Sequence, residues 1–86
     1  MSKFTVYDLK REMEQRGNEP HFFSRKTMRF FGDTMRNYGV RKTTIVTYAG
    51  EVISVYELYR KHPIKHGLIG SAYFDVNTFE RRFPKR

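Results

Sequence analysis

The chain has 86 residues, a formal net charge of +8 and no cysteine. This length allows one domain with a modest core, and the lack of cysteine excludes a disulfide framework and any zinc site built on thiolates. No apolar run approaches the roughly 20 residues that span a bilayer, and residues 1–10 lack the apolar core of a signal peptide. We therefore expect a soluble, intracellular protein, a single domain over residues 1–86, with no membrane partner.

The positive charge is concentrated beyond the first quarter of the chain. Up to Pro20 the basic and acidic side chains cancel, so the whole excess lies from His21 onward. A basic field raises the local concentration of polyanions and speeds their encounter. Charge alone leaves two interpretations open, contact with nucleic acid or a surface that is basic for solubility.

Residues 5–16 are predicted to form a helix. Thr5 is a typical N-cap, the Asp8 carboxylate is favoured near the positive end of a helix, and Gly17 provides the stop. The apolar side chains recur at helical spacing: Val6, Leu9 and Met13. We interpret this element as packing scaffold.

A second helix is predicted over residues 25–38, with Ser24 as N-cap and Gly39 as the stop. One face would be apolar and the other basic: Met28, Phe31, Met35 and Tyr38 against Arg25, Arg29 and Arg36. Gly32 conflicts with a helix interior, since glycine costs about 1 kcal/mol relative to alanine there. Two forms therefore remain open, a continuous or mildly kinked helix, which we expect, and a short helix followed by a turn at Gly32-Asp33.

Three strands are predicted over residues 43–48, 51–59 and 71–76, because these runs are rich in β-branched and aromatic side chains. Ala49-Gly50 between the first two indicates a hairpin. The second run is apolar on both faces through much of its length. We therefore expect it in the centre of the sheet, with helices on one side.

The C-terminal residues carry a further helix signal. Asn77 and Glu80 have the form of a capping box, which predicts a short final helix over residues 78–83. Residues 84–86 are expected to be a frayed basic tail. The expected fold class is thus α+β, with two helices packed on a small, mostly antiparallel sheet of about three strands.

No catalytic constellation stands out. The glycines are scattered singly, and no serine lies in a G-x-S-x-G elbow. His62 and His66 are four residues apart, but Pro63 between them indicates a loop rather than one helical face. Glu57 and Asp75 are acidic candidates for a magnesium site, although any set of nine carboxylates offers such pairs. We expect no enzymatic activity, no metal and no cofactor.

The basic side chains are the candidate site. Arginine matches phosphate oxygens in a bidentate way, and most protein–nucleic acid hydrogen bonds go to the backbone of the nucleic acid. No recognised motif such as a zinc finger or a helix-turn-helix pair is present, so a solvated charged surface is the alternative. The candidate phosphate contacts fall into several groups: Arg25, Lys26, Arg29 and Arg36 on the second helix; Arg41 and Lys42 before the hairpin; Arg60, Lys61 and Lys65 after it; and Arg81 and Arg82 near the C-terminus.

The segment HFFSRKTMRFFGDTMRNYGVR, residues 21–41, resembles a family of small uncharacterised proteins from tailed bacteriophages and prophages, which carry a similar F-F-x-x-x-T-M-R-F-F-G segment. VYELYRKHPIKHG, residues 55–67, resembles a second block of that family. The resemblance implies a phage accessory role in the cytoplasm of an infected bacterium and transfers no catalytic residue. Two functions are expected: binding of DNA or RNA through phosphate contacts or, alternatively, docking on an acidic surface of a bacterial host enzyme, which is thereby inhibited or redirected.

Overall fold

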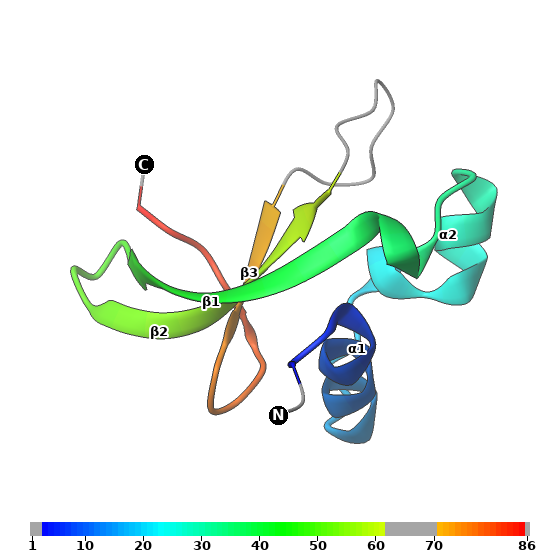
Figure 1. The fold of residues 1–86 in the computed structure, drawn as a ribbon. Coiled ribbons are helices and arrows are strands. Elements are labelled where there is room, and N and C mark those ends of the chain that lie inside the picture. The colour runs from blue at the N-terminus through cyan, green and yellow to red at the C-terminus, as the bar shows by residue number, and fades with distance from the viewer. Residues whose placement is uncertain (1–2, 62–70, 86) are drawn as a thin grey trace.

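The computed structural model describes residues 3–61 and 71–85. Over these residues the chain is α+β, and the elements occur in the following order: α1 (Val6–Gln15), η1 (His21–Phe23), α2 (Arg25–Phe30), η2 (Met35–Asn37), β1 (Tyr38–Val46), β2 (Val52–Arg60), β3 (Ser71–Asp75) and β4 (Arg81–Arg82). The four strands form one antiparallel sheet in the order β1-β2-β3-β4. Figure 1 shows α1 and α2 together at one end of β1, with the β1–β2 hairpin loop at the other. The α+β class is confirmed, with one strand more than predicted.

Helix α1 forms where the sequence predicted it. The Thr5 hydroxyl accepts the backbone N–H of Asp8, and the Asp8 carboxylate accepts the backbone N–H of Thr5 at 2.8 Å. At the other end Gly17 takes a φ of +71°, and the N–H of Asn18 donates into the last turn. Both caps are made by neighbours in sequence, which is why local signals were sufficient here.

The predicted helix over residues 25–38 is wrong in its second half. Helix α2 ends at Phe30, because Gly32 adopts a φ of +66° and the N–H of Asp33 donates back into the last turn, as in a Schellman motif. The chain then makes the 3-10 turn η2 and enters β1 at Tyr38. The structure therefore shows the alternative form, a short helix followed by a turn at Gly32-Asp33.

The early end of α2 changes the surroundings of its predicted apolar face. Phe30 and Phe31 are 81% and 53% exposed, so Phe31 does not belong to the core as the longer helix required. Gly39, the predicted helix stop, lies in β1 instead. A Cβ at Gly39 would lie 2.6 Å from the ring of Tyr59. Glycine is needed here for the close approach of a side chain, not for a left-handed turn.

Strand β2 lies between β1 and β3, as predicted. Strand β1 begins at Tyr38 rather than at residue 43 and ends at Val46 rather than at residue 48. Because β2 begins at Val52, the hairpin loop is longer than the predicted two residues. The hairpin loop closes where the N–H of Gly50, at a φ of +86°, donates to the carbonyl of Thr47 at 2.9 Å. Gly50 takes the left-handed position of this loop, which is the role that glycine has in hairpin turns.

The final helix predicted over residues 78–83 is wrong, because strand β4 pairs with β3 there. The Asp75 carboxylate accepts the N–H groups of Asn77 and Thr78 at 2.7 and 3.2 Å. Phe79 then adopts a φ of +62°, which is incompatible with a helix. The Asp75 carboxylate therefore caps the turn between β3 and β4, where the sequence predicted the start of a helix.

The residues after β4 run beside the end of β1 rather than forming a frayed tail. The N–H of Lys85 donates to the carbonyl of Val46 at 2.7 Å, and Thr47 and Pro84 form an isolated bridge. The segment after β4 thus pairs with the end of β1, at the opposite edge of the sheet. The sheet is therefore curved, so that its two edges approach each other. Arg86 lies outside the described residues.

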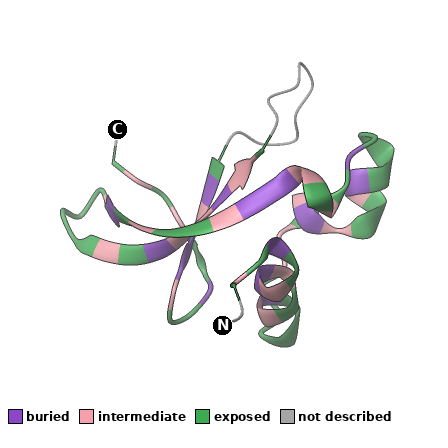
Figure 2. Ribbon diagram, in the orientation of Figure 1, coloured by how far each residue is buried: buried purple, intermediate pink, exposed green. Residues whose placement is uncertain are grey.

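The main core lies between the helices and the first part of β1, where buried positions gather in Figure 2. Each large apolar side chain buried in this way stabilises the fold by about 1.5–3 kcal/mol. No helix in residues 3–61 or 71–85 is both long and apolar enough to cross a membrane. The core is built from every layer of the fold: Val6, Leu9, Met13, Phe23, Met28, Tyr38, Leu58, Ala72, Phe74 and Phe79.

Candidate nucleic-acid interface

Arg60 is a candidate phosphate contact whose side chain is buried in the folded protein. Its side chain is only 7% exposed, and its Nη2 donates to Oδ2 of Asp33 at 2.7 Å. The hydroxyl of Tyr38 donates to the same oxygen at 2.6 Å, and the Asn37 amide donates to Oδ1 at 2.8 Å. The guanidinium is an internal counter-ion, and this position argues against Arg60 as a phosphate contact.

The same network perturbs two pKa values. Burial opposes ionisation of Asp33, but the hydrogen bonds from Tyr38, Asn37, Thr34 and Arg60 outweigh it and hold the pKa of Asp33 below its ordinary value. Burial and the hydrogen bond to the Asp33 carboxylate raise the pKa of Tyr38 to about 12. Both groups keep one ionisation state across the neutral range, so the network holds the fold together rather than transferring protons.

Two further candidate cations are engaged by carboxylates. Arg41 Nε lies 2.6 Å from Glu57, and its guanidinium stacks at 4.8 Å over the ring of Tyr59. Arg82 lies 3.4 Å from Asp75. A cation already paired in this way gains less from a phosphate, because the existing partner must be displaced.

Arg81 has aromatic neighbours in place of a carboxylate. Its guanidinium lies 5.3 Å from the ring centroid of Phe22 and 5.2 Å from that of Phe83. Burial lowers the pKa of Arg81. Arg81 lines neither of the two hollows beside the helices, and Lys65 lies outside the described residues.

Six candidate cations are exposed and have no carboxylate within ion-pair distance among the described residues. These are Arg25, Lys26, Arg29, Arg36, Lys42 and Lys61. Two hollows lie beside the helices and β1, and neither Lys26 nor Lys42 lines them. The other four lie around those hollows, and they are therefore the stronger candidates.

Arg25 and Arg29 line a groove of about 800 Å³ between α1 and α2. Helix α1 contributes Tyr7, which is 54% exposed. Of the apolar side chains around the groove, Phe23 and Met28 are buried and Met35 is half-buried, so Tyr7 and Met35 supply the accessible apolar surface. Apolar side chains beside cations suit a ligand that carries both flat apolar rings and negative charge.

Arg36 and Lys61 line a second hollow, of about 250 Å³, beside β1. The backbone N–H of Lys61 donates to the carbonyl of Asn37 at 2.8 Å, which brings the end of β2 against η2. The ring of Tyr59 lines this hollow too. Two cations far apart in sequence thus become neighbours through one backbone hydrogen bond.

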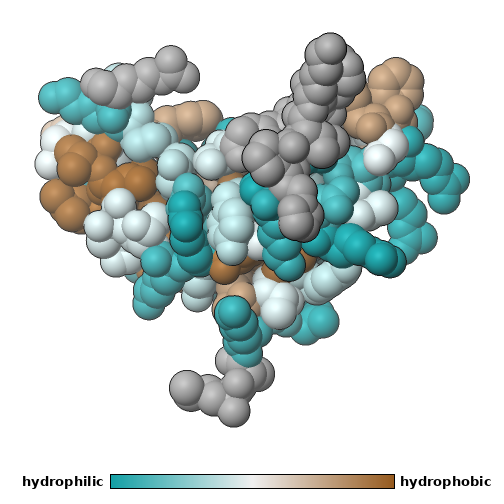
Figure 3. Space-filling view, turned by 45° about the horizontal axis from the view of Figure 1, so that its top comes forward, coloured by the Kyte–Doolittle hydropathy of each residue, from teal (hydrophilic) through white to brown (hydrophobic). Residues whose placement is uncertain are grey.

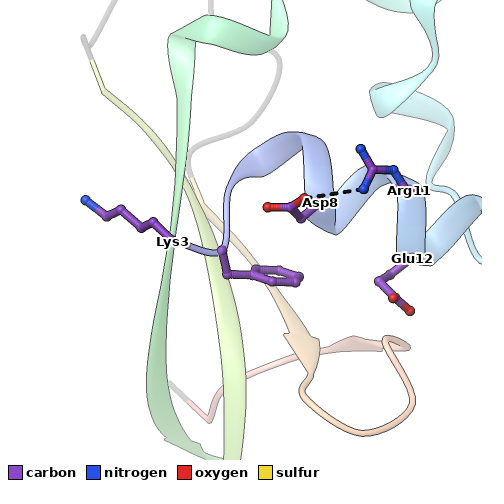
Figure 4. Close-up of a pocket in the computed structure, with 5 residues that line it drawn as sticks. Lys3, Asp8, Arg11 and Glu12 are labelled. Carbon is purple, nitrogen blue, oxygen red and sulfur yellow. Dashed lines mark ion pairs between the residues drawn. The ribbon is translucent and has the colours of Figure 1, made fainter. Parts of the chain in front are cut away.

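Lys3 also lines the second hollow, and the sequence analysis did not identify it as a site residue. In Figure 4 its side chain extends away from Asp8, Arg11 and Glu12, while Asp8 and Arg11 form an ion pair at 3.6 Å. The Lys3 ammonium is therefore turned away from the nearest carboxylates of α1. It adds a third cation to the hollow that holds Arg36.

Tyr7 lines both hollows and so joins them. We call the combined surface the basic track: Lys3, Tyr7, Arg25, Arg29, Arg36, Tyr59 and Lys61. The arginines and Lys61 were predicted as phosphate contacts from the sequence, whereas Lys3, Tyr7 and Tyr59 were not. For Tyr7 the sequence did contain an indication, because this residue adjoins Val6 at the edge of the apolar face of α1. An aromatic ring at that edge can be expected to lie partly exposed.

Fold and surface together define a small, basic α+β protein with a curled antiparallel sheet and a cationic groove beside its helices. No protein family, curated protein or solved structure matches the chain. Within the described part of the chain, no three His, Asp or Glu side chains gather as metal ligands would. His62 and His66 lie outside that part.

Proposed function

We propose that this protein binds nucleic acid through the basic track, with phosphates of the ligand held by its cations. The observation that carries the proposal is that cations from separate parts of the chain converge on two joined hollows: Lys3, Arg25, Arg29, Arg36 and Lys61. Arginine and lysine are the residues that position a phosphate backbone. The net charge of +8 adds a long-range attraction for any polyanion.

The carboxylates beside the track support the same conclusion, because they are already neutralised. Glu14 lies 3.3 Å from Lys10, and the Asp33 side chain is 2% exposed and paired with Arg60. A phosphate that enters the groove therefore meets little repulsion. Arg25 and Arg29, which line the groove and have no carboxylate partner among the described residues, can pair with that phosphate.

We place this activity in the cytoplasm of an infected bacterium, as an accessory function of a phage. The support is the resemblance of residues 21–41 and 55–67 to small phage proteins. Both DNA and RNA are abundant in that setting.

The salt dependence of binding tests the proposal. If about five phosphates are contacted, log affinity for a single strand falls linearly with log salt, with a slope of roughly −3 to −4. The Arg29→Gln/Arg36→Gln variant removes two of these contacts and should make that slope shallower by about 1.4. Lys85→Gln, an exposed cation beside the end of β1, is the control and should change it little. Failure of the unmodified protein to bind any oligonucleotide at low salt would overturn the proposal.

A second candidate function is favoured by a different surface. Val46, Tyr48 and Val52 are 45%, 68% and 71% exposed at the hairpin end, where apolar atoms gather in Figure 3. Exposed apolar patches commonly contact other proteins. We propose as the alternative that the chain docks on a bacterial host enzyme with an acidic surface and inhibits or redirects it. A pull-down after nuclease treatment tests this, since a protein partner remains and a nucleic acid bridge does not.

A further inference from the structure

We infer that the ligand of the basic track is single-stranded nucleic acid, and that the ring of Tyr7 is a platform on which one of its bases stacks. The inference rests on the proposed function. It adds the class of strand and a contact to a base, neither of which follows from charge.

Tyr7 presents a large aromatic ring at the surface, beside the buried face of α1. Its neighbours on α1, Val6 and Leu9, are 4% and 0% exposed, whereas Tyr7 is 54% exposed. No aromatic ring of the described residues stacks on it, in contrast to Phe4, which stacks on Tyr56 at 4.4 Å. An aromatic ring without a partner offers its face to a nucleobase, and every base has a face to match it.

Cations flank Tyr7 on both sides. Arg25 and Arg29 lie along the groove on one side, and Lys3 and Arg36 lie around the hollow on the other. A strand that follows the track would set its phosphates against these two groups. The base between them would then reach the ring.

The residues that line the groove favour a single strand over a duplex. In a duplex the bases are stacked on one another, so a protein meets phosphates and groove edges only. Those contacts would use the cations and leave the exposed ring of Tyr7 and the half-buried Met35 without a partner. An unpaired base can be splayed out and can enter a groove of about 800 Å³.

The other exposed rings suit this role less well. Tyr59 packs against Gly39 and carries the Arg41 guanidinium at 4.8 Å. Phe30 and Phe31 pair edge-to-face with centroids 5.0 Å apart, and they line neither hollow. Tyr7 is the exposed ring that lies between two groups of cations.

The test measures the affinity for an oligothymidylate of about 15 nucleotides and for a duplex of the same length, by fluorescence anisotropy. Tyr7→Leu removes the ring and keeps most of the apolar area, whereas Tyr7→Phe keeps the ring. Tyr48→Leu is the matched control, because Tyr48 is 68% exposed at the hairpin end. Circular dichroism confirms that each variant is folded.

We expect the unmodified protein to prefer the single strand. Tyr7→Leu should weaken that binding by roughly 5- to 160-fold, the range that corresponds to loss of one base–aromatic stack. Tyr7→Phe should remain within about twofold, and Tyr48→Leu should have no effect. All of these variants should keep the same salt slope, because none changes a charge.

Several results would overturn the inference while leaving the proposed function in place. One is unchanged affinity of Tyr7→Leu for single strands while Arg29→Gln/Arg36→Gln still lowers the salt slope. Another is equal or tighter binding of the duplex. A third is displacement of the oligonucleotide by polyglutamate of equal charge at equal concentration. That result would mean that binding to the track depends on charge alone, as expected for an acidic protein partner. Absence of binding to either nucleic acid would remove both proposals.

Discussion

Asp33 shows how a single side chain determines the path of the chain around it. Its carboxylate accepts the N–H of Thr34, the amide of Asn37, the hydroxyl of Tyr38 and the guanidinium of Arg60. Two of these donors lie at the start of β1 and the end of β2, so the carboxylate fixes the corner where α2 gives way to the sheet. In the sequence, Gly32-Asp33 looks like a defect within a helix. Its partner Arg60 lies 27 positions further on, where no local pattern could identify it.

Replacing Asp33 by alanine should destabilise the fold strongly. The Arg60 guanidinium would remain buried without its counter-charge, which costs about 3–5 kcal/mol in comparable cases. Urea unfolding followed by circular dichroism measures the loss. Glu51→Ala, at an exposed carboxylate of the hairpin loop, is the control and should change stability by less than about 0.5 kcal/mol.

A double variant separates the charge from the packing at this site. In Asp33→Ala/Arg60→Met the unpaired charge is gone, so part of the lost stability should return. If the double variant were less stable than the sum of its two single variants, the charge would not be the cause. The ion pair would then matter mainly through its shape.

The stability of the protein should fall at both ends of the pH scale. The pKa of Tyr38 rises from 10.0 to about 12 on folding, so its contribution is complete below pH 10 and is lost as the pH rises through 12. The pKa values of Asp33 and Asp75 are lowered on folding. Their contribution is present above about pH 4 and is lost as the pH falls through their folded pKa values.

Tyr38→Phe isolates the alkaline part of this profile. The variant cannot ionise at residue 38, so its unfolding free energy should fall less steeply between pH 10 and 12 than that of the unmodified protein. Tyrosinate absorbance gives an independent measurement, because the difference between the two proteins is the titration of Tyr38 alone. A difference curve centred near the ordinary value of 10.0 would contradict the prediction.

At the scale of whole elements, prediction succeeded where the decisive contacts are local. Thr5, Asp8 and Gly17 define α1 with partners within a few residues. The predicted helix at 78–83 failed for the opposite reason, since Asp75 lies outside the Asn77–Glu80 pattern and captures its first N–H groups. A capping-box pattern is therefore ambiguous when an aspartate precedes it by two residues.

Substitution of Gly32 by alanine distinguishes the two forms considered for residues 25–38. In a continuous helix Gly32→Ala would stabilise the protein by about 1 kcal/mol. With a φ of +66° at Gly32 it should instead destabilise by about 1–2 kcal/mol, although no atom lies within 4 Å of the added Cβ. The sign of the change in unfolding free energy decides between the two forms.

Gly39→Ala should also destabilise the protein, by a different cause. Here the added Cβ meets the ring of Tyr59 at 2.6 Å, while φ at Gly39 is not positive. Tyr59→Ala should therefore relieve much of the cost of Gly39→Ala but none of the cost of Gly32→Ala. Additive losses for Gly39→Ala and Tyr59→Ala in a double-mutant cycle would show that the two residues do not touch.

At the scale of the whole molecule, the distribution of charge follows from which carboxylates are used internally. Each of the seven ion pairs of the described residues engages a different carboxylate, out of nine in the chain. Most carboxylates are thus neutralised by ion pairs within the protein, and the cations of the basic track remain without a carboxylate partner among the described residues. The sequence identified the arginines of the track but placed them on one long helix. The groove arises because α2 ends early and lies beside α1, a tertiary arrangement that helical periodicity does not contain.

This distribution predicts that a polyanion stabilises the protein against heat. A ligand that binds only the folded state at about 100 times its dissociation constant adds about 2.7 kcal/mol, which in a chain of this size raises the melting temperature by roughly 10–20 °C. Thermal unfolding with and without oligothymidylate measures the shift. Dextran at the same mass concentration controls for crowding, which contributes at most about 1 kcal/mol.

The salt dependence of this shift links stability to the track. Under the proposed function this stabilisation would derive from phosphate contacts. It should then shrink as salt weakens binding, and it should be smaller in Arg29→Gln/Arg36→Gln than in Lys85→Gln. A shift that persists unchanged at high salt would mean that the oligonucleotide binds through its bases alone. A shift equal in the two variants would move the binding surface away from α2 and η2, toward cations such as Arg81 that lie beyond the track. The thermal measurement thus tests the location of the interface as well as its existence.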